Sequence, residues 1–574
     1  MESYIHLYKT NDEFTASYNG PDYKEPWLSL TEQNMEVNYN KPKLTAITFG
    51  SITWVTDVPA TGGKATKDNC RFEVYGNYDN GTSVDISSDA IVTGELAVEP
   101  STAEQRHEAG QLILTASYSG FTATGNVTVY QAADFSTKPL TFNILSAGTI
   151  NWTASDSTVT KTIDYKVNND EWKSIKSNTG SSAPTITVNP GDKVQFRGNN
   201  AQYANSSSRY NSFSGSTASF EAEGNIMSLI YGDDFKNNST ISSAYAFTSL
   251  FEYCANLVSA ENLILPATTL TNSCYRNMFY NCTSLTTAPA LPATTLANWC
   301  YSSMFDGCTS LTTAPVLPAT TLAERCYQHM FRGCTSLTTA PELPATTLVT
   351  WCYNYMFNGC TSLTTAPSIL PARTLVDYCY SNMFYNCTSL TAAPELPATT
   401  LANYCYQYMF KGCSKLTTAP ELPATNLASN CYANMFDGCT SLTTAPVLPA
   451  TTLAYSCYYY MFNGCTSLTT APELPATTLA ESCYQYMFSN CTSLTTAPVL
   501  PATTLATSCY QYMFEGCTRL NYIKCLATNI SASYCTNNWV SGVAKTGTFV
   551  KASSMTSWTT GTKGIPTGWT VQNA

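Results

Sequence analysis

The sequence predicts a multidomain protein in which N-terminal all-β sandwich domains precede a solenoid of short helices and strands, an α/β solenoid. The main observation is a segment of 26 residues, once lengthened to 27, that recurs ten times in nearly identical form. A repeat of this length indicates stacked units, each of which buries its apolar face only against its neighbours. Before the repeats, short runs of alternating polarity predict strands, and 574 residues are too many for a single core. The copies begin at Leu265, Leu291, Leu317, Leu343, Leu370, Leu396, Leu422, Leu448, Leu474 and Leu500.

The N-terminal part divides into an arm and two β domains. Residues 1–40 are polar and aromatic and end in an Asn-rich stretch, and we expect an anchoring arm there. Over residues 41–134, period-two runs such as Gln111–Ala116 recur between turn signals and predict an antiparallel sandwich. A second sandwich-like domain is expected over residues 135–235, where alternating runs flank the turn Asn189–Asp192.

Each repeat predicts one short helix followed by one short strand. In one copy, apolar side chains recur every fourth residue, at Leu322, Cys326, Met330 and Cys334, which predicts one face of a helix. The stretch that follows is β-prone and ends at a proline, which limits it to one short strand per turn. The solenoid is expected over residues 236–525, with an atypical first copy and a C-terminal cap over residues 526–574.

The repeat resembles a known family. Its pattern M-F-x-G-C-T-S-L-T-T-A-P-x-L-P is similar to the BspA-type leucine-rich repeat, and the likeness covers about residues 240–525. Residues 44–132 resemble bacterial immunoglobulin-like domains. The combination resembles surface proteins of gut Bacteroidetes and of the phages that infect them, which implies an adhesin or a host-binding protein.

Composition excludes some partners. The net charge of −11 argues against nucleic acid, because phosphates need a basic face. The sequence contains no run of 18 apolar residues, so we expect no membrane insertion. The first residues lack the basic and apolar regions of a secretory signal, and this favours transport on an assembled particle.

The sequence offers no evident catalytic, cofactor or metal site. The three histidines, His6, His107 and His329, lie in different regions, and the glutamates that follow the repeat proline do not form a fixed pair. Twenty of the 24 cysteines occur as two per repeat, eight residues apart, which is no zinc spacing. We expect buried thiols packed as small apolar groups. Disulfides between copies and a metal site are the alternatives. The prediction is therefore a protein that is not an enzyme and has no cofactor.

The variable positions of the repeats supply the candidate site. While the apolar frame hardly changes, five positions in each predicted helix vary. Three are mostly polar, such as Glu324, Gln328 and Arg332, and predict an outward face. Beside them lies a pair that is often aromatic. Stacked copies would align these rings into a strip suited to sugar rings. The alternative is that the rings lie over adjacent turns and close the flank of the solenoid. The candidate residues are Trp299, Trp351, Tyr355, Tyr378, Tyr404, Tyr408, Tyr460, Tyr486 and Tyr512. The invariant tyrosine after the first cysteine, such as Tyr327, is assigned to packing.

These observations predict a non-enzymatic recognition protein, most simply a phage virion fibre or decoration protein. Its solenoid would bind a glycan or a protein of the bacterial host surface, and its arm would bind other virion proteins. A homo-oligomer would add avidity. The expected location is the virion surface, after assembly in the host cytoplasm. A bacterial cell-surface adhesin and a purely structural decoration protein are the alternatives.

Overall fold

The computed structural model describes residues 5–10, 13–18, 42–58, 62–99, 107–131, 134–556 and 558–574. The chain divides into two compact units, Met1–Asp134 and Phe135–Ala574. Of the predicted arm, the structure describes only an antiparallel hairpin of β1 (Ile5–Thr10) and β2 (Glu13–Tyr18); the rest of it lies outside the described residues. In the described part of the chain, no helix has the length and apolar character needed to cross a membrane.

The first unit contains small antiparallel sheets around one apolar core. The sheets have the strand orders β3-β5-β6, β7-β9-β10 and β4-β8. Alternation along β9 shows why the core forms, since Leu112 and Leu114 are fully buried while Ile113 between them is exposed. The strands are β3 (Leu44–Trp54), β4 (Gly63–Thr66), β5 (Cys70–Tyr78), β6 (Ser83–Asp85), β7 (Ile91–Thr93), β8 (Glu95–Val98), β9 (His107–Tyr118) and β10 (Phe121–Gln131), with the 3-10 helix η1 (Lys67–Asn69).

The second unit begins with a β region whose main sheet has the order β15-β14-β17-β11-β20-β21. Phe142 on β11 packs against four other phenylalanine rings at the centre of its core. The strands are β11 (Leu140–Ile144), β12 (Gly148–Asn151), β13 (Thr153–Ala154), β14 (Thr162–Val167), β15 (Lys173–Lys176), β16 (Thr185–Val188), β17 (Lys193–Arg197), β18 (Ala204–Ser206), β19 (Arg209–Ser212) and β20 (Phe220–Asn225), with the 3-10 helices η2 (Ser157–Val159) and η3 (Gly180–Ser182).

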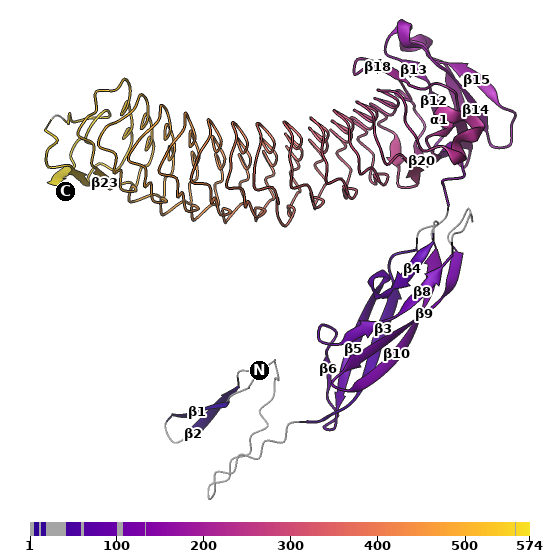
Figure 1. Ribbon diagram of the computed structural model, residues 1–574, viewed down its shortest axis with the longest axis horizontal. Coiled ribbons are helices and arrows are strands. Elements are labelled where there is room, and N and C mark those ends of the chain that lie inside the picture. The colour runs from indigo at the N-terminus through magenta and orange to yellow at the C-terminus, as the bar shows by residue number, and fades with distance from the viewer. Residues whose placement is uncertain are drawn as a thin grey trace, which may run out of the picture. The chain divides into compact units, whose positions relative to one another are not determined.

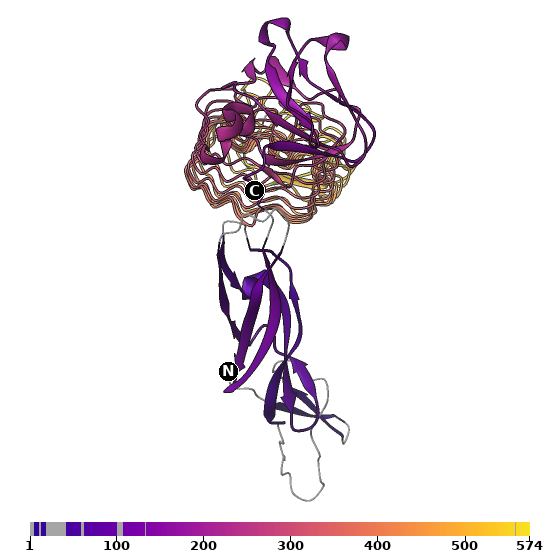
Figure 2. The same ribbon diagram turned by 90° about the vertical axis from the view of Figure 1, so that its right-hand side faces the viewer.

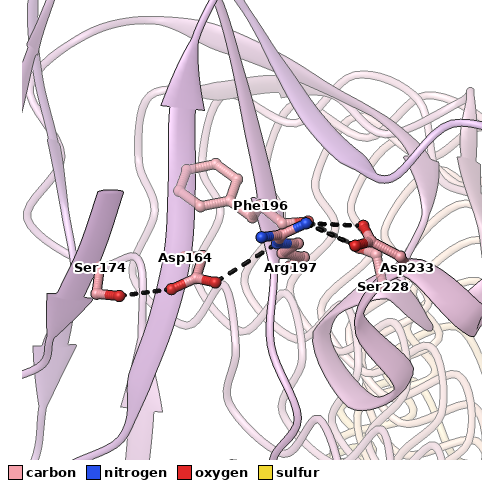
Figure 3. Close-up of polar contacts among 6 residues, drawn as sticks. All are labelled: Asp164, Ser174, Phe196, Arg197, Ser228 and Asp233. Carbon is pink, nitrogen blue, oxygen red and sulfur yellow. Dashed lines mark hydrogen bonds and ion pairs between the residues drawn. The ribbon is translucent and has the colours of Figure 1, made fainter. Parts of the chain in front are cut away.

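Polar contacts tie this sheet to the segment that leads into the repeats, α1 (Ser228–Tyr231) and the 3-10 helix η4 (Gly232–Asn237). Arg197 on β17 donates to Asp233 at 2.7 Å and to Asp164 of β14 at 3.4 Å (Figure 3). The Ser228 hydroxyl donates to the Phe196 carbonyl oxygen at 2.9 Å. One apolar cluster continues from the β region into the repeats, so the two share a core across residue 235, where the sequence predicted a domain boundary.

From β20 onward, successive segments pair in parallel. β20 pairs with β21 (Leu257–Ser259) and β22 (Leu263–Ile264) of the atypical first copy, and Ser259 then pairs with Thr287 of the next copy. Single-residue bridges such as Thr313 to Thr339 continue this pairing from copy to copy. At the far end β23 (Tyr522–Cys525), β24 (Thr548–Lys551) and β25 (Thr570–Asn573) form a parallel sheet. The turns follow one another in Figure 1 and overlie one another in Figure 2. The strand expected in each regular copy is therefore reduced to isolated bridge residues.

The predicted short helix of each repeat is wrong. Its place is taken by a run of turns in which every fourth residue has a positive φ, as at Trp299, Ser303 and Gly307. Backbone N–H groups alternate between two acceptors. Tyr301 donates to Cys326 of the next copy at 3.1 Å, whereas Met304 donates to Tyr301, three residues back. The four-residue spacing of apolar side chains thus comes from a ladder of turns bonded between copies, not from a helix bonded within one.

The interior of the stack consists of columns of identical side chains. The invariant tyrosines are at most 2% exposed, and their ring centroids lie 5.7–6.2 Å apart along the stack. This confirms their assignment to packing. A parallel column of phenylalanines has spacings of 5.4–5.8 Å. Trp539 covers both columns at the C-terminal end.

The repeat cysteines lie in this core as free thiols, as expected. The second cysteine of each copy has a defined partner: its Sγ–H donates to the carbonyl oxygen of a phenylalanine one copy earlier, as Cys334 does to Phe305 at 3.1 Å. Burial raises the pKa of the Cys352 thiol to about 12, so such thiols stay protonated at neutral pH.

Candidate functional site

Three columns of residues with positive φ run along one flank of the stack. We name the first two columns by the residue that follows them in each copy, and the third by the glycine that most often occupies it. The pre-cysteine column comprises Ser273, Trp299, Arg325, Trp351, Tyr378, Tyr404, Asn430, Ser456, Ser482 and Ser508. The pre-methionine column comprises Asn277, Ser303, His329, Tyr355, Asn382, Tyr408, Asn434, Tyr460, Tyr486 and Tyr512. The glycine column, before the second cysteine, comprises Asn281, Gly307, Gly333, Gly359, Asn386, Gly412, Gly438, Gly464, Asn490 and Gly516.

The three columns differ in which side chains they admit. The glycine column holds only Gly and Asn, the residues that most readily adopt left-handed backbone. The other two columns hold Ser or Asn in some copies and Trp, Tyr, Arg or His in others. A left-handed conformation costs a side chain with a Cβ roughly 1–2 kcal/mol. Bulky residues at such positions are outliers of the kind that cluster at functional sites.

All nine candidate residues of the sequence analysis lie in these columns, and all nine are half-buried. The structure places them in two parallel columns rather than one strip. The pre-cysteine column contains Trp299, Trp351, Tyr378 and Tyr404. The pre-methionine column contains Tyr355, Tyr408, Tyr460, Tyr486 and Tyr512.

Three pairs of neighbouring tyrosines in these columns stack, whereas Trp351 and Tyr378 are tilted by 47° at 5.5 Å. The Tyr378 and Tyr404 centroids are 4.6 Å apart with an interplanar angle of 4°. In the other column, the Tyr460–Tyr486 and Tyr486–Tyr512 pairs are 4.1 and 4.5 Å apart. Stacked rings cover each other's faces, so the inner rings offer mainly edges and hydroxyls to solvent. Tyr404 and Tyr512 end their stacks, because the next residues in their columns are asparagines.

Two arginines of this surface, Arg276 and Arg325, were not among the residues predicted from the sequence. The Arg325 guanidinium carbon lies 3.7 Å from the Trp351 ring centroid and 4.4 Å from that of Trp299. Arg276 also lies 4.4 Å from the Trp299 centroid. Arg325 stands at the same repeat position as Trp351, a signal that was open to sequence comparison. Arg276 belongs to the position after the invariant tyrosine, and only the fold brings it to Trp299.

The expected polar outward face is only partly present. Glu324, Gln328 and Arg332 are half-buried. At the equivalent positions of other copies, however, Asn354 is 5% and Asp306 is 4% exposed, so the outward assignment is wrong for those copies. These side chains bond along the stack: Gln328 donates to Asn354 at 3.0 Å, and Arg332 pairs with Asp306 at 2.9 Å. Burial raises the pKa of the Asp306 carboxyl to about 6, although the hydrogen bond and the charge of Arg332 lower it.

Among the described residues, the histidines, cysteines and carboxylates offer no group of side chains gathered around one point. His329 contacts Tyr355 edge to face at 5.1 Å, and burial lowers its pKa to about 4. The side chains of His6 and His107 lie outside the described residues. Within the described ranges, no three His, Cys, Asp or Glu side chains gather as a metal-binding group. The glutamates that follow the repeat proline, such as Glu342 and Glu395, are exposed.

Comparison with known proteins bears on the repeats. A family model described as the BspA type leucine rich repeat region (6 copies) matches residues 228–364, 301–443 and 429–541. Together the matches span 314 of the 574 residues. No curated protein matches the chain. The crystal structure of a leucine-rich repeat protein from Bacteroides ovatus is similar at 18% identity, over 57% of this chain and 86% of that chain, with a TM-score of 0.32. So low a TM-score adds no argument to the family match.

Proposed function

Because this chain belongs to the BspA-type leucine-rich repeat family, we propose that it is a non-enzymatic recognition protein of a virion or cell surface. Its repeat stack, a leucine-rich-repeat solenoid, binds a glycan or protein of a bacterial surface. The β domains, the first of them immunoglobulin-like, hold the solenoid away from its point of attachment.

One observation carries this proposal: bulky rings occupy left-handed positions that other copies fill with Ser or Asn. The copy with Asn430 and Asn434 has the same frame and no ring in either column, so the turns do not need the rings in order to form. A left-handed backbone costs roughly 1–2 kcal/mol for each ring residue, and this cost offsets the roughly 0.5–1.5 kcal/mol by which a stacked pair stabilises the fold. The rings then stabilise the fold only through their partial burial. Contact with a ligand explains why rings concentrate in some copies.

The chemistry of the surface suits sugars. Tyrosine hydroxyls and the amides of neighbouring Asn and Gln side chains offer hydrogen-bond donors and acceptors along both columns. A sugar ring needs an aromatic face to stack against, and among the described residues Tyr404 and Tyr512 each stack with only one other ring. We therefore assign the sugar-stacking contacts to these two rings and the hydrogen bonds to the ring edges between them.

Variants that exchange residues between copies test the proposal. In one variant Trp351, Tyr378 and Tyr404 become Asn, as at Asn430; in a second, Tyr460, Tyr486 and Tyr512 become Asn, as at Asn434. The control changes the exposed Glu342, Glu395 and Glu421 to Ser. Binding to host envelopes and thermal unfolding are measured together. The proposal expects lost binding with a melting temperature close to wild type in at least one ring variant, and no loss in the control.

A structural decoration protein is the second candidate, and the close ring stacks favour it. For a structural role we expect the opposite results: both ring variants should have a lowered melting temperature and intact binding to host envelopes. Carriage on a phage particle is a separate part of the proposal. Immunogold labelling with antibody to residues 240–574 locates the protein on virions or, if it is a cell-surface adhesin, on uninfected cells alone.

A further inference from the structure

Three residues of the pre-cysteine column, together with Arg276 beside it, form a group in which cations and indoles alternate. Arg276, Trp299, Arg325 and Trp351 come from four successive copies, and each guanidinium lies within 4.4 Å of an indole centroid. Trp299 thus contacts guanidinium groups from the copy before it and the copy after it. Three of the four residues, Trp299, Arg325 and Trp351, hold left-handed backbone with φ of 56–61°.

The two arginines are incompletely paired, unlike Arg332 and Lys411 of the same stack. Arg332 and Lys411 pair with Asp306 and Asp437 at 2.9 and 2.8 Å. Among the described residues, no carboxylate lies within ion-pair distance of Arg276. The ion pair of Arg325 with Glu324 is long, at 3.7 Å. The Nε–H of each arginine is buried without an acceptor. In a chain of net charge −11, these two neighbouring guanidinium groups thus share only one long ion pair.

We propose that this group, which we call the Arg–Trp ladder, binds the anionic substituent of an acidic glycan. The inference rests on the proposed function and names the ligand class of the same surface. The indole faces orient the planar guanidinium groups, and their N–H edges match the oxygens of a carboxylate or sulfate. The sugar ring that carries the anion then lies along the neighbouring ring edges of Trp351 and Tyr378.

The electrostatics favour an anion at this place. Burial is the main cause that lowers the pKa of Arg276; the charge interaction with Tyr245 raises it, the positive charge of Arg325 lowers it further, and Glu252 raises it. The two guanidinium groups thus repel each other in a partly desolvated site, and a bound anion relieves that repulsion. The attraction is screened by salt, so binding should weaken as ionic strength rises.

Other copies supply variants that retain the fold. Arg325→Ser places the residue found at Ser273, Ser456, Ser482 and Ser508, and Arg276→Gln places the residue found at Gln328, Gln407, Gln485 and Gln511. The control is Arg373→Thr with Lys415→Ser, which also introduces residues common at those positions. Both control residues are exposed and lie outside the ladder, and the pair removes the same two charges.

The test measures binding of the full chain to heparin, to polygalacturonate and to neutral dextran. We expect both polyanions to bind and dextran not to bind. The Arg276→Gln/Arg325→Ser variant should lose roughly tenfold or more in affinity and the control less than twofold. If heparin binds and polygalacturonate does not, the anion recognised is a sulfate; the reverse result identifies a carboxylate. Equal losses in variant and control overturn the site.

Two further results separate the possible failures. If poly-glutamate binds as tightly as polygalacturonate, the ladder recognises any anionic chain and the glycan assignment is wrong. If neither polyanion binds while the tyrosine variants still abolish attachment to envelopes, the ladder proposal fails and the proposed function stands. If polyanion binding depends on the ladder while envelope binding is unchanged in every variant, the proposed function fails instead.

Discussion

Replacing glycines of the glycine column with alanine changes the free energy of unfolding, and the sign of that change depends on the backbone conformation. In Gly333 and Gly438, φ is +70° and +76°, and an added Cβ would find its nearest atoms at 3.8 and 3.7 Å, which is ordinary contact. The cost of Gly333→Ala with Gly438→Ala is therefore conformational rather than steric. At roughly 1–2 kcal/mol per site, the double variant should lose about 2–4 kcal/mol. In a helix the same changes would gain about 2 kcal/mol, because Ala exceeds Gly in helix propensity.

The assay is thermal unfolding followed by circular dichroism. The unfolding entropy of a domain is roughly proportional to its length. For the second unit, residues 135–574, this loss of unfolding free energy corresponds to a fall in melting temperature of about 2–4 °C. The matched control is Gly333→Asn with Gly438→Asn, since Asn tolerates this conformation and occurs at Asn281, Asn386 and Asn490. We expect the control to melt within about 1 °C of wild type. An alanine variant more stable than wild type would refute the ladder of turns.

Three further predictions follow from the same structure. Gly307→Ala should destabilise more than Gly333→Ala, because its Cβ would overlap the amide oxygen of Asn281; Asn281→Gly should remove the difference in unfolding free energy. Cys334→Ser should cost about 1 kcal/mol less than Cys326→Ser in denaturant unfolding, because its hydroxyl retains the carbonyl acceptor of the thiol. Burial raises the thiol pKa values of the repeats above those of unfolded chains, so the stability they contribute is full below about pH 8.5. Above that pH the unfolding free energy should fall by about 1.4 kcal/mol per thiol per pH unit, and a denaturation midpoint equal at pH 7.5 and 9.5 would contradict this.

The period of the repeat illustrates what the sequence could and could not predict. From the 26-residue copies, the stacking of the units, the family and the buried residues were predicted correctly, because identical side chains recur at the same position of each copy. Apolar residues at steps of four were assigned to a helix. Four residues of a helix turn about 400°, so a strict step of four drifts about 40° each time. The unbroken step of four from Cys326 to Cys334 was the sign of turns, and the Gly or Asn before each second cysteine was the sign of left-handed backbone.

The sequence predicted that the nine candidate rings align along the stack but not how they are arranged, and ligand binding by them stays a prediction. All nine rings share one flank because each occupies one of two positions, before the first cysteine or before the methionine, that recur in every copy. Comparison of the copies identifies these positions from sequence alone. Their division into two stacked columns depends on the ladder of turns. Arg276 escaped prediction because it reaches Trp299 from a different repeat position, across a copy boundary.

The central claim is that rings in the two left-handed columns contact a ligand, and hydroxyl-radical footprinting of the wild-type chain tests it most directly. Labelling of each aromatic side chain is compared between free protein and protein bound to host envelopes. Tyr165 and Tyr231 of the β region, also half-buried, serve as internal controls. We predict protection of Tyr404 and Tyr512 and unchanged labelling of the controls. Equal labelling of all four tyrosines in the bound and free states would contradict it.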